Sequence, residues 1–363
     1  APSGTGGPPV SDGKTPYTGL PARAFWKTGV AEPGLDGLRD LWASHWVLPS
    51  DARFATFGSC FAQHIGRALV ARGMNWLDAE AAPGRTPPDI ARAFNFGVFS
   101  ARTGNIYTAA QLLLLVRLAT GADDPRLPEV WTDGARFADS LRPAIEPGGF
   151  GTADEALLSR ISMLRAFRRA IAQADVFVFT LGLTEGWENA ETGQPYAMCP
   201  GTVAGAFDPG RHRFRQYRSD EIRAALEQAV KLMRRVNPGL RVLLTVSPVP
   251  LTATASGQHV LVATMHSKAV LRTVAGEMAA EDDGVDYFPS YEIVAGAPAA
   301  ARLYAENLRS VTPAGVDLVM RHFFAGLGLA APAAHAAEAT PDPEAEAEAR
   351  MAAEDLVCEE RLL

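Results

Sequence analysis

Short apolar runs alternate along the chain with longer segments in which apolar residues recur every three to four positions. The runs at 53–57, 175–181, 240–246 and 285–288 are rich in β-branched and aromatic residues, which is typical of buried strands. The spacing predicts helices at 61–72, 109–118, 155–174, 220–236, 261–280 and 313–324. Because strands and helices alternate, we expect an α/β fold with a mostly parallel sheet covered on both faces.

The pattern divides the chain into three parts. Residues 1–50 begin with Gly and Pro and then carry several aromatic residues, so we expect an N-terminal arm packed on the core. Residues 51–330 form a single folded domain, and 331–363 form an acidic, flexible tail. Within the domain, 121–153 and 184–217 read as long loops, which we interpret as walls of a site at the carboxyl ends of the strands.

Charge is concentrated in the tail. It holds nine acidic and two basic residues, so this segment accounts for the whole net charge of −7. The remainder is close to neutral and lacks the clustered Lys and Arg of a nucleic-acid-binding protein. The last ten residues regain apolar character, and two interpretations stay open, a segment that docks on a protein partner and a frayed end.

Three cysteines, Cys60, Cys199 and Cys358, give neither a disulfide framework nor the spacing of a metal site. We therefore expect no bound metal. No apolar run approaches the roughly 20 residues of a membrane-spanning helix, and the N-terminus lacks the pattern of a signal peptide. These features predict a reduced, cytoplasmic compartment and no membrane span.

Ser59 lies at the turn between the first predicted strand and the following helix. Amide groups at such a helix N-terminus can stabilise an oxyanion, so Ser59 is a candidate nucleophile. The alternative is that Ser59 only caps the helix, a position that serine favours. The adjacent Cys60 is a rival nucleophile or a small buried residue.

The run Gly58-Ser59-Cys60-Phe61-Ala62 resembles the signature of the GSCFA family, a branch of the SGNH (GDSL-like) hydrolase superfamily. Further runs resemble this family in the same order along residues of about 20 to 325. They are Asn95-Phe96-Gly97, Gly104-Asn105-Ile106-Tyr107, the segments 180–187, 199–202, 245–251 and 267–272, and the segment 287–292.

The resemblance implies a flavodoxin-like three-layer sandwich with Ser59 as the nucleophile. It also implies an oxyanion hole completed by a backbone Gly and an Asn side chain, but Thr184 stands where that Asn is usual. Asn95 or Asn105, with the Gly97 amide, are the substitutes that we consider. For each Asn, a turn or capping role is the alternative.

The superfamily usually carries Asp-x-x-His before the last helix, and here these positions are Asn307 and Ser310. A serine nucleophile needs a base. We expect His259, in the loop after the strand at 240–246, to be that base. The alternative is that this histidine has only a structural role in its loop. Glu185 would orient it or act as an acid itself, the alternative being a surface carboxylate.

Lys268 and Arg272 are spaced i and i+4, so they either face an anionic substrate or form a solvated face. Together these residues predict acyl-ester hydrolysis or O-acyl transfer on a glycan or another hydroxylated small molecule. No cofactor is implied, although a transferase would need an acyl donor such as acyl-CoA. The alternative is a non-catalytic binding protein that has lost the Asp-x-x-His block.

Overall fold

The structure is a computed structural model that describes residues 15–328, and it confirms the expected α/β fold. A five-stranded parallel sheet has the strand order β2-β1-β5-β8-β9. Its strands are β1 (Arg53–Gly58), β2 (Asn75–Trp76), β5 (Val176–Leu181), β8 (Arg241–Val246) and β9 (Val285–Phe288). The chain passes from β1 outward to β2 on one side, and from β5 outward through β8 to β9 on the other. The strand order therefore reverses between the neighbours β1 and β5.

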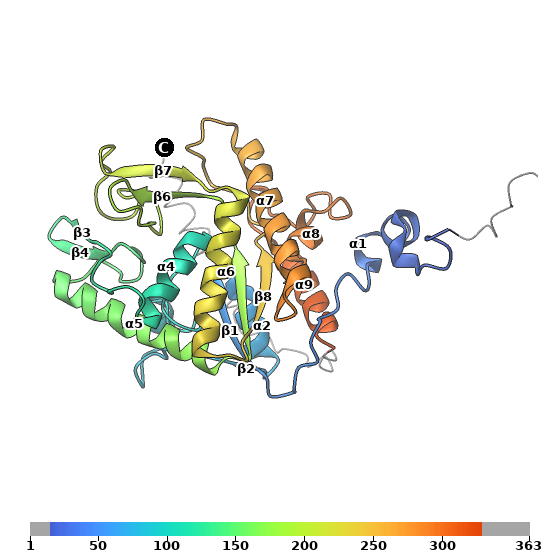
Figure 1. Cartoon of the computed structure of the whole chain (residues 1–363), viewed down its shortest axis with the longest axis horizontal. Helices are drawn as coiled ribbons and strands as arrows, with labels where there is room; N and C mark the ends of the chain where they lie inside the picture. Colours follow the sequence, from blue (N-terminus) through green and yellow to red (C-terminus); the bar gives the residue numbers. More distant parts are fainter. Residues whose placement is uncertain (1–14, 329–363) are drawn as a thin grey trace, which may run out of the picture. The chain divides into compact units, whose positions relative to one another are not determined.

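Helices cover both faces of the sheet and form a three-layer sandwich. They are α2 (Ala62–Ala71), α3 (Pro88–Ala93), α4 (Ala109–Thr120), α5 (Ala153–Gln173), α6 (Ser219–Val236), α7 (Val260–Glu281), α8 (Ser290–Ala295) and α9 (Pro313–Gly326). In Figure 1, α4, α5 and α6 lie on one side of the sheet, and α8 and α9 lie on the other. All six residues of β5 are buried, as the continuous apolar run predicted.

Several helices begin at residues whose side chains satisfy the free amides of the first turn. Thr108 and Gln111 form a capping box at α4. Thr152 caps α5 and Thr312 caps α9, each by accepting a backbone N–H of the first turn. The predicted helices agree with the observed ones to within a few residues, whereas β2, α3 and α8 are too short for periodicity to reveal.

The two segments predicted as loops contain β-structure, which corrects that prediction. Residues 121–153 include the hairpin of β3 (Val130–Asp133) and β4 (Arg136–Asp139), and 184–217 include the hairpin of β6 (Glu185–Asn189) and β7 (His212–Gln216). Their polar residues mask the alternation on which strand prediction depends. Both hairpins lie on the same side of the sheet, beyond α4 (Figure 1).

The β3–β4 hairpin is fixed to α5 by a buried ion cluster. The carboxylate of Asp139 pairs with Arg142 at 2.9 Å and with Arg160 at 2.5 Å, and all three side chains are fully buried. Burial alone would raise the pKa of Asp139, but the two guanidinium groups lower it below its ordinary value. Removing one partner from such a cluster leaves an uncompensated buried charge.

Glu129 connects the two hairpins. Its carboxylate accepts hydrogen bonds from Trp131 at 3.1 Å, from Asn189 at 2.8 Å and from Tyr196 at 2.9 Å. Trp131, Tyr196 and two alanines form a small apolar cluster that is separate from the main hydrophobic core. Trp187 packs against this small cluster. The hairpins therefore form one connected body.

The chain divides into two compact units, the first ending at Leu41. In the part of this unit that the structure describes, 15–41, the chain forms a 3-10 turn (Ala22–Ala24), a π-helical turn (Lys27–Ala31) and α1 (Gly34–Gly37). An N-terminal arm on the core stays a prediction, and the tail at 331–363 lies outside the described residues. None of the described helices is both long enough and apolar enough to cross a membrane.

Candidate active site

Ser59 directly follows β1, at the point where the strand order reverses. Its backbone N–H donates to the Thr180 carbonyl at 3.0 Å, which joins the ends of β1 and β5. Gly58 has a φ of +131°, and a Cβ on it would lie 2.4 Å from the Thr180 oxygen. Only glycine fits there, so Gly58 is required by the close approach of the two strands.

The side chain of Ser59 is buried but is not used in the fold. It is 2% exposed, and within residues 15–328 its Oγ has no hydrogen-bond partner. The N-cap of α2 is Phe61, with no side-chain cap bond, so the interpretation of Ser59 as a helix cap is wrong. A buried hydroxyl without a partner costs free energy, which points to a role other than stability.

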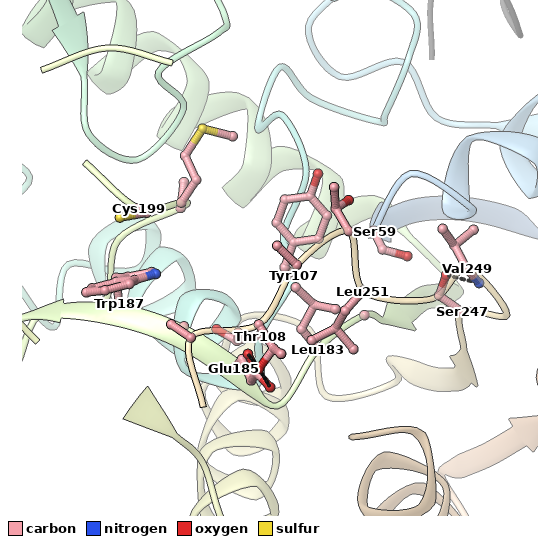
Figure 2. Close-up of a pocket in the computed structure, with 18 of the residues that line it drawn as sticks. Ser59, Tyr107, Thr108, Leu183, Glu185, Trp187, Cys199, Ser247, Val249 and Leu251 are labelled. Atoms are coloured by element: carbon pink, nitrogen blue, oxygen red, sulfur yellow. Dashed lines mark hydrogen bonds between the residues drawn. The ribbon is translucent and has the colours of Figure 1, made fainter. Parts of the chain in front are cut away.

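Ser59 lines a cavity of about 290 Å³ at the carboxyl ends of the strands. The cavity is lined mainly by apolar side chains, among them Leu183, Trp187, Val249 and Leu251. Figure 2 shows Ser59 beside Tyr107, with Trp187 far from Ser247 and Val249. The cavity therefore places Ser59 among apolar side chains, with room for a small organic group.

Gly182 brings the end of β5 against Ser59. A Cβ on Gly182 would lie 3.1 Å from Ser59 Cβ and 3.1 Å from the Tyr107 carbonyl oxygen. That carbonyl accepts the backbone N–H groups of Gly182 at 3.2 Å and Leu183 at 2.9 Å. The segment after β5 is thus held close to Ser59.

Lys268 also lines the cavity. The sequence predicted only that Lys268 shares a helix face with Arg272, not that it lines the same cavity as Ser59. Its side chain is fully buried, and its Nζ donates to the Gly182 carbonyl at 2.7 Å. Burial lowers the pKa of Lys268 from 10.5 to about 7. Arg272, expected on the same face, instead pairs with Glu292 and lies over the Tyr287 ring.

The structure does not bring His259 to Ser59. His259 is an exposed residue at the N-terminus of α7, where its Nδ1 accepts the Leu261 N–H at 3.2 Å. It is not among the residues that line the cavity, and neither is His64 in α2. This arrangement gives no support to the expectation that His259 takes the proton of Ser59.

Glu185 lines the cavity at the start of β6 and is 7% exposed. Thr254 donates to its Oε1 at 2.8 Å and to its Oε2 at 2.9 Å. Burial raises the pKa of Glu185, opposed by these hydrogen bonds. The carboxylate therefore faces the cavity, held by Thr254 and not by His259.

The expected oxyanion donors are mostly elsewhere. Asn95 and Gly97 lie in a turn with φ of +59° and +69°, and Asn95 lines a smaller cavity of about 60 Å³. Asn105 lines that cavity too, and its Nδ2 donates to Tyr107 Oη at 3.0 Å. Thr184 Oγ1 accepts from Gln216 at 2.7 Å, outside the Ser59 cavity. Asn105 is thus connected to the Ser59 cavity through Tyr107, which lines both cavities.

The segment that replaces Asp-x-x-His forms a local turn. Asn307 Oδ1 accepts the backbone N–H of Arg309 and Ser310 at 3.0 and 2.9 Å, and its Nδ2 donates to Ser310 Oγ at 3.0 Å. Arg309, one of the two residues between Asn307 and Ser310, lines the cavity that contains Ser59. Sequence reasoning missed Arg309, although its position inside the replaced block was a usable signal.

Two cysteines line the same cavity, Cys60 beside Ser59 and Cys199 on the opposite wall. Burial raises the pKa of Cys199 to about 11, so its thiol is protonated at neutral pH. Among residues 15–328, no group of three or more His, Cys, Asp or Glu side chains is arranged to hold a metal ion.

No curated protein matches the chain, while five chains of solved structures do. One is the periplasmic domain of a lipopolysaccharide acetyltransferase from Salmonella ser. Paratyphi A. It is 13% identical, with a TM-score of 0.27, and the match covers 86% of this chain and 97% of that one. At this TM-score the similarity supports no conclusion about function.

The model of the GSCFA family matches residues 53–323, which is well over half of the chain and contains every residue of the cavity. The matched region begins with β1 and ends within α9. The chain therefore belongs to the GSCFA family.

Proposed function

We propose that the protein transfers an acyl group through Ser59, either to water as an esterase or to a hydroxylated acceptor such as a glycan as an O-acyltransferase. The observation that carries the proposal is the Ser59 hydroxyl, which is buried, has no partner within residues 15–328 and lines a cavity at the strand-order reversal. Sites in open α/β sheets lie at this point.

The chemistry has two steps. Ser59 Oγ bonds to the acyl carbonyl carbon and loses its proton to a base, while one carbonyl electron pair moves to oxygen. Collapse of this intermediate expels the leaving alcohol or thiol, which takes up a proton, and leaves an acyl-serine. Water or an acceptor hydroxyl then removes the acyl group. A transferase would use an acyl donor such as acyl-CoA.

Apolar walls beside Ser59 fit the acyl portion of a substrate, and the Glu185–Thr254 pair offers polar contacts to a hydroxylated portion. Trp187 lines the same cavity and supplies a flat surface of the kind that sugar rings pack on. The substrate is therefore an ester whose two parts differ in polarity. The cytoplasmic location expected from the cysteines stays a prediction.

The test is labelling with a fluorophosphonate probe and turnover of p-nitrophenyl acetate. Wild type should be labelled on Ser59 and should hydrolyse the ester, and Ser59→Ala should lose both activities by about a thousandfold. The matched control is Ser219→Ala, an exposed serine at the start of α6, which should behave as wild type. Equal turnover by wild type and Ser59→Ala would remove Ser59 as the nucleophile.

A non-catalytic binding protein is the second candidate, and one observation favours it. Asn307 and Ser310 bond to each other and supply neither acid nor base. This candidate predicts no probe labelling of Ser59, together with saturable binding of acylated sugars measured by calorimetry. Labelling of Ser59 would exclude it.

Cys60 is the rival nucleophile, since it lines the same cavity and lies close enough to Lys268 for their charges to interact. If Cys60 were the acyl carrier, Cys60→Ser would abolish turnover and Ser59→Ala would not. Its reaction with iodoacetamide would also be far faster than that of a free thiol. Our proposal predicts the opposite pattern.

A further inference from the structure

We infer that Lys268 is the general base that removes the proton from Ser59, in place of the histidine that is absent from the segment before α9. The inference deepens the proposed function, and it rests on Ser59 being the nucleophile. Lys268 is then a catalytic residue, and not only a cation that attracts an anionic substrate.

The position of the amine carries the inference. Lys268 Nζ is 2.7 Å from the Gly182 carbonyl oxygen, and Gly182 is the residue whose Cβ would lie 3.1 Å from Ser59 Cβ. The Lys268 amine and the Ser59 side chain thus lie beside the same glycine, and both residues line one cavity. Nζ is not bonded to Ser59 Oγ in this structure, as is common for catalytic pairs without substrate.

The geometry also selects Lys268 over the other groups that line the cavity. Glu185 is hydrogen bonded through both oxygens to Thr254, and Cys199 carries a protonated thiol. Tyr107 and Tyr196 are phenols, whose ordinary pKa near 10 is too high for a base at neutral pH. No histidine is among the residues that line this cavity in the described part of the chain.

Burial, with a contribution from the charge of Arg309, favours the neutral form of the Lys268 amine, which can accept a proton. Burial in α7 lowers its pKa to about 7, interaction with Cys60 raises it, and interaction with Arg309 lowers it. On its own helix, His266 and Arg272 face outward, the first exposed and the second paired with Glu292. A base with a pKa near the working pH is the most effective.

Lys268 passes the proton of Ser59 to the leaving group. The neutral Nζ uses its lone pair to take the Ser59 proton, while one of its N–H bonds still donates to the Gly182 carbonyl. Ser59 Oγ forms its bond to the acyl carbon, and the resulting ammonium then protonates the leaving oxygen or sulfur. The amine is restored as the acyl-serine forms, and it can activate water or an acceptor hydroxyl in the second step.

Arg309 is a positioning residue in this scheme. It occupies the block that would hold Asp-x-x-His, and its positive charge lowers the pKa of Lys268. Replacing Arg309 by Met should therefore shift the pH dependence of Ser59 reactivity to higher pH without removing it.

The experiment measures the rate of fluorophosphonate labelling of Ser59 between pH 5 and pH 10. Wild type should show a rate that rises with pH to a plateau with a midpoint near 7. Lys268→Met should be slower by about a hundredfold or more, since general bases contribute that much. Lys268→Arg, which keeps the charge but cannot act as a base, should also be slow. Lys231→Met, an exposed lysine in α6, and His259→Ala should match wild type.

Two further measurements separate chemistry from structure. In Lys268→Ala, added methylamine should restore part of the labelling rate in proportion to its concentration, which a purely structural role would not produce. In Arg309→Met, where Lys268 is intact, the midpoint should rise. Circular dichroism shows whether each variant is folded.

The outcomes distinguish the two proposals. Labelling of Ser59 in Lys268→Met at the wild-type rate and with the wild-type midpoint would overturn the base assignment and leave the proposed function standing. If His259→Ala lost the labelling of Ser59 and Lys268→Met kept the wild-type labelling rate, His259 would be the general base. No labelling of Ser59 in wild type at any pH would overturn both proposals.

Discussion

Replacing Lys268 by Met should stabilise the folded protein while it inactivates the site. Lys268 is fully buried, and among the interactions that lower or raise its pKa no carboxylate appears. Its charged form is therefore unfavourable in the folded state. Met has a similar length and carries no charge, so the substitution removes this cost.

The magnitude follows from the pKa. A fall from 10.5 to about 7 is equivalent to about 5 kcal/mol between the two protonation states of Lys268. The variant also loses the hydrogen bond to the Gly182 carbonyl, which costs about 1–3 kcal/mol because that oxygen is left without its partner. Below pH 7 we therefore expect the free energy of unfolding of Lys268→Met to be about 2–4 kcal/mol higher than that of wild type.

The sign of the pH dependence is fixed as well. Between pH 7 and pH 10.5 the unfolded wild-type chain holds a proton at Lys268 that the folded chain has released, so wild-type stability rises with pH. The advantage of the variant should shrink by about 2–3 kcal/mol between pH 7 and pH 9.

Urea unfolding followed by circular dichroism at pH 6, 7, 8 and 9 measures both effects, with Lys231→Met as the control that should change neither. A variant less stable than wild type at pH 6, or a difference that does not vary with pH, would show that Lys268 is not a destabilised buried cation. The reasoning for its role as a base would then lose its physical support.

Three further predictions concern other parts of the fold. His259→Ala should lower stability by about 1 kcal/mol through loss of a helix cap, with labelling of Ser59 unchanged; thermal unfolding and the probe assay test both. Asp139→Asn should cost about 3–5 kcal/mol in urea unfolding because it leaves two buried guanidinium groups uncompensated, and a loss under 1 kcal/mol would contradict this. Gly58→Ala should cost several kcal/mol, since its Cβ would lie 2.4 Å from the Thr180 oxygen; a soluble, fully labelled variant would refute the argument.

The parallel sheet and its long helices could be predicted from the sequence because their signals are local. The continuous apolar run at 175–181 predicts a strand that is buried on both faces of the sheet. Ser59 follows another predicted strand, at a glycine that marks its end. Periodicity does not detect elements such as β2, with two residues, and the polar hairpins.

The site was harder to predict because its members come from distant segments. His259 lies in the right part of the chain, but its ring caps α7 and is exposed. Lys268, nine residues later, turns inward on the same helix, which depends on how α7 packs and not on the i, i+4 spacing. Arg309 could have been found by asking what the altered Asp-x-x-His block now presents to Ser59.

The Glu129 connection between the hairpins has a consequence for how this protein could change over time. Trp187 and Tyr196 belong to the hairpin body, whereas Ser59 and Lys268 belong to the sheet and the helix α7. Substitutions in the hairpins can therefore reshape the part of the cavity that we propose selects a substrate, without moving Ser59 or Lys268. Exchange of the two hairpin segments between family members, made together so that Glu129 keeps its partners, should transfer substrate preference as a unit.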